Sequence, residues 1–260
     1  MLTVPMQKQK LDQGFTLVEL AIVLVIVGVL VGSFLATLGS RIETTRRAEA
    51  KKEMGVIKQA LYGYAMSQAN PHLPCPDCRV VSASCPAANL NDGLEDRDIA
   101  TGLCETGSNV VGNLPWMTLG LGSGDPWSDR YSYWVASSAA DDGSVSGNKI
   151  LLTTSPMAGE ATIATRVNGA LVGLSNSALA VIMTQGKNGY GTISDQGVAK
   201  PAVPAANVDE KDNLDNNLNF VSRSPTKPGA TTAGGEFDDM LVWISEYELK
   251  AKMVEAGVLP

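Results

Sequence analysis

Residues 20–40 read LAIVLVIVGVLVGSFLATLGS, a run of 21 residues that contains no charged side chain. A helix of about 20 apolar residues is long enough to cross the hydrocarbon core of a membrane. Two other interpretations are a buried helix of a soluble protein and the core of a cleaved signal peptide, which is typically about 7–15 residues long. Because this run is longer than such a core and an acidic residue stands at its entrance, it favours a transmembrane helix, which we place at residues 15–38.

A short motif precedes the apolar run. Residues 13–20 read QGFTLVEL, with Glu19 at the edge of the apolar segment. A carboxylate in this position is costly, so it marks a functional residue whose partner has to be identified. The motif closely resembles the type IV prepilin signature, and the resemblance covers roughly residues 8–40. An ordinary signal anchor is the alternative interpretation.

The resemblance implies a processing reaction and an assembly contact. A membrane-embedded prepilin peptidase would cut after Gly14, remove residues 1–14 as a leader, and methylate the new amino terminus at Phe15. Glu19 would then meet the amino group of a neighbouring subunit in a fibre, where opposite charges attract strongly in a low-dielectric layer. The resemblance also implies a single pass through the bacterial inner membrane, with a globular domain in the periplasm that later coats a pilus or pseudopilus fibre.

The chain after the apolar run is amphipathic. Between residues 41 and 68, apolar side chains recur at helical spacing at Ile42, Met54, Ile57, Leu61 and Tyr64. The simplest interpretation is one long helix over residues 15–70, whose second half packs on a globular domain at residues 71–260. Asn70-Pro71 is expected to end the helix, because a residue before proline disfavours helical geometry.

Four cysteines follow, at Cys75, Cys78, Cys85 and Cys104. The first two form a CxxC pair, which in a cytosolic protein would indicate zinc binding or redox chemistry. A pilin-like domain would lie outside the cytoplasmic membrane, where thiols oxidise, so two disulfides are favoured over a four-cysteine zinc site or a redox pair. Four cysteines allow three pairings, between which the sequence does not choose; we expect Cys75–Cys104 with Cys78–Cys85.

The remaining chain predicts a sheet. Strand-like segments occupy residues 131–136, 150–154, 162–167, 170–174, 178–184 and 240–244. Asn168-Gly169 between two of them is a hairpin signal. No helices alternate with these strands, which favours antiparallel pairing. Residues 192–236 form a long polar insertion, the surface we expect to contact other subunits or ligands.

The chain closes with a capping box, Ser245-Glu246-Tyr247-Glu248. It predicts a short helix that runs to about Ala256 and ends at Gly257. The expected fold is α+β and pilin-like. A long N-terminal helix, transmembrane in its first half, packs on an antiparallel sheet that carries a long loop insertion and a short C-terminal helix.

Part of the globular region is similar to the major pseudopilins of type II secretion. Residues 125–133 read DPWSDRYSY, whereas those proteins carry an Asp-Pro-Trp-Gly turn before a strand, so Ser128 stands in place of a glycine. The resemblance extends to QGKNGYG at residues 185–191 and FDDM at residues 237–240, and it implies Ca²⁺ bound to Asn188, Asp238 and Asp239. Oxygen ligands suit this hard cation. A turn with an aspartate pair that caps the last strand is the alternative.

Composition limits the function. With 20 basic and 27 acidic residues the net charge is −7, which argues against nucleic-acid binding. The chain has one histidine, His72, and none of the GxSxG, HExxH or P-loop motifs, so we expect no enzymatic activity.

The expected function is therefore structural: a minor pilin or pseudopilin of a type IV pilus or a type II secretion pseudopilus. The expected partners are prepilin peptidase, other pilin or pseudopilin subunits, the inner-membrane assembly platform and the lipid bilayer. Calcium is the one candidate cofactor. The alternative function is a pilus-tip binding or adhesion module that acts through residues 192–236.

Overall fold

The computed structural model describes residues 16–107, 110–144 and 150–259, and for residues 33–38 it describes the backbone alone. The chain divides into two compact units, with the division between Thr45 and Arg46. One helix, α1 (Leu17–Ser67), begins in the first unit and ends in the second. The helix predicted at residues 15–70 is thus confirmed, with small shifts at both ends.

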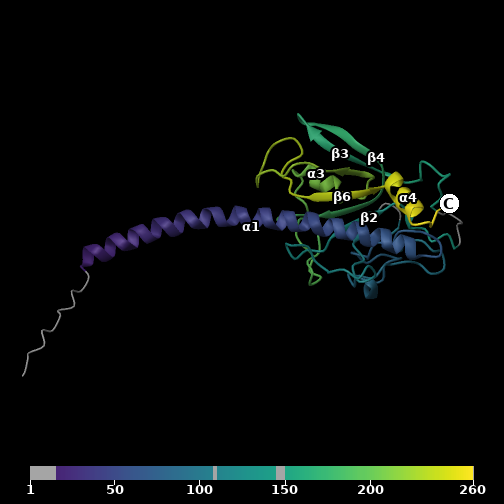
Figure 1. Ribbon diagram of the computed structural model, residues 1–260, viewed down its shortest axis with the longest axis horizontal. Helices are drawn as coiled ribbons and strands as arrows, with labels where there is room; N and C mark the ends of the chain where they lie inside the picture. The colour runs from purple at the N-terminus through teal and green to yellow at the C-terminus, as the bar shows by residue number, and fades with distance from the viewer. Residues whose placement is uncertain (1–15, 108–109, 145–149, 260) are drawn as a thin grey trace, which may run out of the picture. The chain divides into compact units, whose positions relative to one another are not determined.

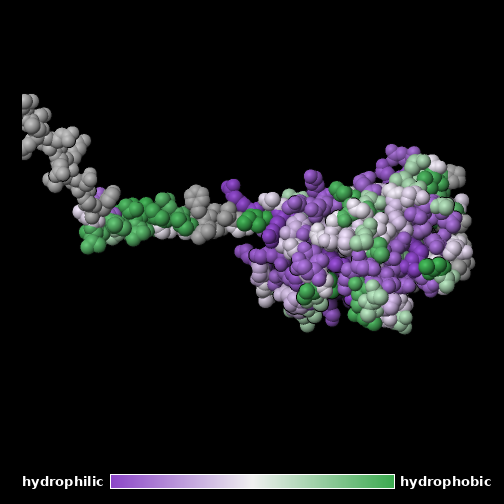
Figure 2. Space-filling view, turned by 90° about the horizontal axis from the view of Figure 1, so that it is seen from below, coloured by the Kyte–Doolittle hydropathy of each residue, from purple (hydrophilic) through white to green (hydrophobic). Residues whose placement is uncertain are grey.

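In the first unit, α1 presents an apolar surface. Every residue from Thr16 to Gly32 is exposed, and Figure 2 shows a nearly continuous hydrophobic surface along this part of the helix. Among the described residues, no helix meets both the length and the apolarity required for a membrane crossing. The span predicted at residues 15–38 includes Phe15 and the side chains of residues 33–38, which lie outside the description; the span stays a prediction.

The second unit contains a six-stranded sheet (Figure 1). Its strands are β1 (Gly112–Asn113), β2 (Ser132–Val135), β3 (Ala161–Val167), β4 (Ala170–Thr184), β5 (Asn219–Val221) and β6 (Met240–Ser245). The order is β1-β2-β4-β3-β5, and β6 pairs with β4. The longest strand, β4, therefore pairs with three neighbours and forms the centre of the sheet.

The sheet is mixed, so the prediction of a purely antiparallel sheet is wrong. β3 and β5 run parallel, with Ile163 opposite Phe220. Parallel neighbours need a long connection between them. Here the connection consists of β4 and the segment after it, which includes the short helix α3 (Val208–Asp212). The predicted insertion at residues 192–236 therefore contains both α3 and β5.

The strand predicted at residues 150–154 is also wrong, because this segment is irregular. Ile150 is buried, whereas Leu151 and Leu152 are 45% and 44% exposed. The apolar residues of this segment are typical of a strand, but their side chains do not alternate between the core and solvent. None of the sheet's strands pairs with this segment.

The strands predicted at residues 170–174 and 178–184 are a single strand, β4. The polar residues between them stay extended, and Ser175 lies opposite Ile163. The first half of β4 is largely exposed, so polar side chains are tolerated without a turn. The predicted hairpin is confirmed, since Asn168 and Gly169 have φ values of +51° and +84°.

The C-terminal helix α4 (Glu246–Glu255) follows β6 as predicted. The Ser245 side chain accepts a hydrogen bond from the Glu248 backbone amide at 3.2 Å, which satisfies one free amide of the first turn. Gly257 follows with a φ of +72°. Among the described residues, the sequence analysis missed three short helical segments: α3, α2 (Ser137–Ala140) and a 3-10 turn at Ala87–Asn89.

One hydrophobic cluster joins the second half of α1 to the sheet and to α4. From α1 the cluster includes Met54, Ile57 and Leu61, each at most 3% exposed. The helical spacing of apolar residues is therefore confirmed in this half of α1. Ile42, predicted to lie on the same face, is 48% exposed.

Candidate functional site

Thr16 caps the start of α1. Its Oγ1 accepts a hydrogen bond from the Glu19 backbone amide at 3.2 Å, and its carbonyl accepts one from the Leu20 amide at 3.1 Å. Thr16 and Glu19 thus have capping-box spacing, a signal that the sequence analysis did not use here. Glu19 is exposed in the first turn, where the helix dipole favours negative charge. Gly14 and Phe15, the predicted cleavage and methylation sites, lie outside the described residues.

A second candidate site lies where α3 meets the start of β6. We call Glu210, Asp238 and Asp239 the acidic cluster: one carboxylate oxygen of each lies within 4.8 Å of the others. The three residues are 1%, 8% and 4% exposed. The two aspartates were predicted from the sequence and Glu210 was not, because no local pattern indicates that a residue of α3 returns to this position.

The acidic cluster has two polar atoms without partners. Asp238 Oδ1 and Asp239 Oδ1 are buried and accept no hydrogen bond. Burial, together with the charge of Glu210, raises the pKa of Asp238 to about 7 and raises the pKa of Asp239 well above its usual range. Burial also raises the pKa of Glu210. Ionised carboxylates are costly in such a place unless a cation compensates them. Oxygen ligands of this kind fit Ca²⁺.

Asn188 lies beside the acidic cluster and donates to it. Its backbone amide donates to Asp238 Oδ2 at 3.0 Å, and its Nδ2 donates to Glu210 Oε1 at 2.8 Å. Its Oδ1 accepts a hydrogen bond from the Tyr190 amide at 3.0 Å. The structure thus brings Asn188, Asp238 and Asp239 together, while the role of Asn188 as a metal ligand stays a prediction.

Comparison with known families bears on the first site. A family model described as the prokaryotic N-terminal methylation motif matches residues 9–35. The chain carries the type IV prepilin signature. This signature supports a pilin-like structural protein that is processed by prepilin peptidase and assembles with other subunits. No curated protein and no solved structure matches the chain significantly. The similarity of the globular unit to pseudopilins stays a prediction.

The second unit, which we call the globular unit, contains two disulfides. They join Cys75 to Cys104 and Cys78 to Cys85, with Cα–Cα distances of 5.2 and 6.0 Å. These are the pairs expected from the sequence. Each of the four sulfurs is held in a disulfide, so none is a thiolate that could bind zinc.

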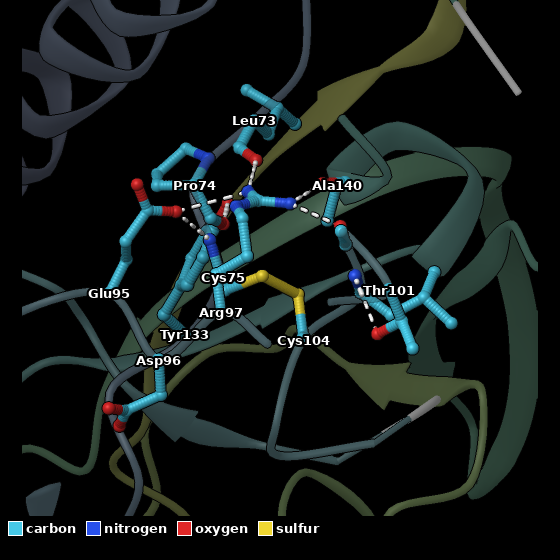
Figure 3. The surroundings of a disulfide bond; sticks show 12 residues. Leu73, Pro74, Cys75, Glu95, Asp96, Arg97, Thr101, Cys104, Tyr133 and Ala140 are labelled. Atoms are coloured by element: carbon cyan, nitrogen blue, oxygen red, sulfur yellow. Dashed lines mark hydrogen bonds and ion pairs between the residues drawn. A yellow bond between two sulfur atoms is a disulfide. The ribbon is translucent and has the colours of Figure 1, made fainter. Parts of the chain in front are cut away.

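Arg97 organises the loop around the Cys75–Cys104 disulfide (Figure 3). Its guanidinium donates to the carbonyls of Gly102 and Ala140 at 2.7 and 2.6 Å, and to that of Leu73 at 3.3 Å. It also pairs with Glu95 Oε2 at 3.0 Å. One side chain therefore connects three separate backbone segments, and Leu73 and Ala140 of these segments belong to the hydrophobic cluster.

The turn at residues 125–129 leads into β2, as the sequence predicts. Asp125 Oδ1 accepts hydrogen bonds from the Trp127 and Asp129 amides at 2.8 and 3.0 Å. Ser128 has a φ of +64°, in the left-handed region that favours glycine. The chain therefore keeps a glycine-like conformation at the position where the resembling proteins have glycine.

Proposed function

We propose that this protein is a minor pilin or pseudopilin subunit of a type IV pilus or a type II secretion pseudopilus. The observation that carries the proposal is the prepilin signature, which lies at the start of a long helix whose first part is apolar and exposed. In this function the protein performs no chemistry. It is processed, retained in the inner membrane by its helix, and added to a fibre.

Two contributions to assembly follow from this proposal: a charge pair between subunits and apolar packing between their helices. Cleavage after Gly14 frees the amino group of Phe15, and the Glu19 carboxylate of a neighbouring subunit is its opposite charge. In a low-dielectric fibre core this pair is costly to leave unmade, so it sets the register between neighbouring subunits. The exposed apolar face of α1, including Leu17, Ile22 and Ile26, supplies the packing area.

Cleavage tests the first step. In cells that contain a prepilin peptidase, Gly14→Ala should leave the leader attached, because the resemblance implies an enzyme that requires glycine at the cut. Immunoblotting and mass spectrometry of the amino terminus provide the measurement. A normally shortened Gly14→Ala product would contradict the pilin interpretation.

Assembly tests the second step. Glu19→Gln should be processed normally and should enter sheared fibres poorly, because the substitution removes the charge and keeps the shape. Glu49→Gln, at an exposed glutamate of the same helix, is the matched control and should assemble normally. Equal incorporation of Glu19→Gln and wild type would refute the register role.

We also propose that the globular domain binds Ca²⁺ at Asn188, Asp238 and Asp239. The two unpartnered, buried aspartate oxygens support this proposal. The ion would hold the 185–191 turn against the start of β6. Thermal melting of the full chain in detergent, with calcium or with a chelator, tests it: an unchanged melting temperature would remove the site.

A further inference from the structure

The acidic cluster joins segments that are distant in sequence. Glu210 belongs to α3, within the 192–236 insertion, whereas Asp238 and Asp239 directly precede β6. α3 is already attached to two strands, because Arg166 of β3 pairs with Asp209 at 2.6 Å and Asn213 exchanges two hydrogen bonds with Val221 of β5. The acidic cluster is a further contact, between α3 and the residues that precede β6.

Existing hydrogen bonds already orient Glu210 toward the aspartates. Its Oε1 accepts from the Asp238 backbone amide at 3.0 Å, and its Oε2 accepts from Asn207 Nδ2 at 2.9 Å. Asp239 is oriented in the same way, because its Oδ2 accepts from Asn213 Nδ2 at 2.7 Å. Neutral donors thus position these side chains.

One oxygen of each aspartate has no hydrogen-bond partner. Asp238 Oδ1 and Asp239 Oδ1 belong to residues that are more than nine-tenths buried, and neither has a hydrogen-bond partner. A buried acceptor without a partner is destabilising, and more so when it is charged. A single cation between the three carboxylates would remove this destabilisation at both oxygens.

We propose that Glu210 is a direct carboxylate ligand of the Ca²⁺ ion, together with Asp238 and Asp239, and that the ion links α3 of the 192–236 insertion to the start of β6. This inference rests on the calcium proposal above and adds to it a ligand from a different part of the chain. Ca²⁺ accepts irregular sets of oxygen ligands, whereas Mg²⁺ requires near-octahedral geometry and retains waters. A buried site with three carboxylates and no histidine or free thiol among its members suits Ca²⁺.

The inference predicts a response at a distance. When Ca²⁺ binds, residues 207–213 should become more protected from hydrogen exchange, because α3 can no longer separate from β6 without releasing the ion. A calcium site built only from Asn188, Asp238 and Asp239 would protect the 185–191 turn and leave α3 unchanged. The two arrangements therefore differ in which peptide responds.

The test is hydrogen exchange and calcium titration of the full chain in detergent, with CaCl₂ as the probe and MgCl₂ and NaCl as ionic controls. In wild type, Ca²⁺ should raise the melting temperature and slow exchange at residues 207–213. Glu210→Gln should weaken binding by at least about tenfold, since even indirect changes around metal sites cost 10–100-fold. Asp212→Asn, on the same short helix and outside the acidic cluster, should respond like wild type.

Each outcome is decisive. Calcium binding that Glu210→Gln leaves intact would overturn the role of Glu210 and leave the simpler calcium site standing. No calcium response in wild type would overturn both calcium proposals, while the cleavage and assembly tests of the pilin function would be unaffected. If Glu210→Gln does not fold, the wild-type exchange pattern decides: Ca²⁺-dependent protection of residues 207–213 supports the role of Glu210, and protection confined to residues 185–191 overturns it.

Discussion

The two halves of α1 have similar helical geometry and opposite surroundings. In the first unit, Leu24 and Val25 are 64% and 66% exposed, and the described side chains make few contacts beyond their own helix. In the second unit, Leu61 and Ala65 are fully buried in the hydrophobic cluster. The apolar side chains of the first half are thus uncovered by this chain, whereas those of the second half are covered by the sheet and by α4.

This difference shows which kind of information each half carries. The features of the first half form a local pattern, an unbroken apolar run with one carboxylate. Such a pattern can be recognised directly in the sequence. The second half is held by contacts with segments more than 100 residues away in the sequence. One example is the ion pair between Lys58 Nζ and Glu248 Oε1, at 2.9 Å. The same substitution should therefore have different effects on stability in the two halves.

The largest effect is expected from a matched pair of leucines. Leu61→Ala should lower the free energy of unfolding of the globular unit by about 2–5 kcal/mol, because it leaves a cavity in the core. Leu24→Ala, the same change in the exposed half, should leave this value unchanged. Urea unfolding monitored by tryptophan fluorescence provides the measurement. Similar losses for both variants would show that the two halves are not energetically separate.

The two disulfides allow a comparison within the globular unit. Cys75–Cys104 closes a sequence separation of 29 residues and Cys78–Cys85 one of 7. Loop entropy predicts losses of about 3.6 and about 2.4 kcal/mol when each pair is changed to alanine. Chemical denaturation of the two double variants measures the difference. A larger loss for the shorter loop would contradict the entropic explanation.

A buried carboxylate makes the globular unit sensitive to pH. Asp77 is fully buried, and burial raises its pKa to about 7. The pKa of an aspartate in an unfolded chain is about 4, so the folded state binds the proton more tightly. The stability from this group is complete below pH about 4 and is lost as the pH rises through about 7.

Asp77→Asn should therefore reduce the fall in melting temperature between pH 5 and pH 8, measured in the presence of a chelator. Asp215→Asn, at an exposed aspartate, is the control and should leave the pH dependence of wild type unchanged. Identical pH profiles for Asp77→Asn and wild type would show that Asp77 does not titrate in this range.

The smallest effect is expected at the turn before β2. Ser128→Gly should raise the free energy of unfolding by about 0.5–1 kcal/mol, because glycine adopts a positive φ without the steric cost that serine carries. Differential scanning calorimetry is sensitive enough to detect this gain. A loss of stability would mean that the Ser128 side chain makes a contact that outweighs the backbone strain.

The sequence predicted those features whose signals are local. The long helix, the Asn168-Gly169 hairpin, the Ser245 cap and the two aspartates of the acidic cluster all have short patterns. The parallel β3–β5 pair and the position of Glu210 do not, because both depend on where a long insertion returns to the sheet. Residues 150–154 have a strand-like composition, but their side chains do not alternate between core and solvent and no strand of the sheet pairs with them.

The burial of Met54, Ile57 and Leu61 has a practical consequence for crystallisation. A shortened chain that begins after Ser67 would expose the apolar surface these residues cover and would aggregate. One that begins at Arg46, at the division between the two units, keeps the buried half of α1 and removes the exposed one. The helix thus marks where the chain can be cut to obtain a stable globular fragment.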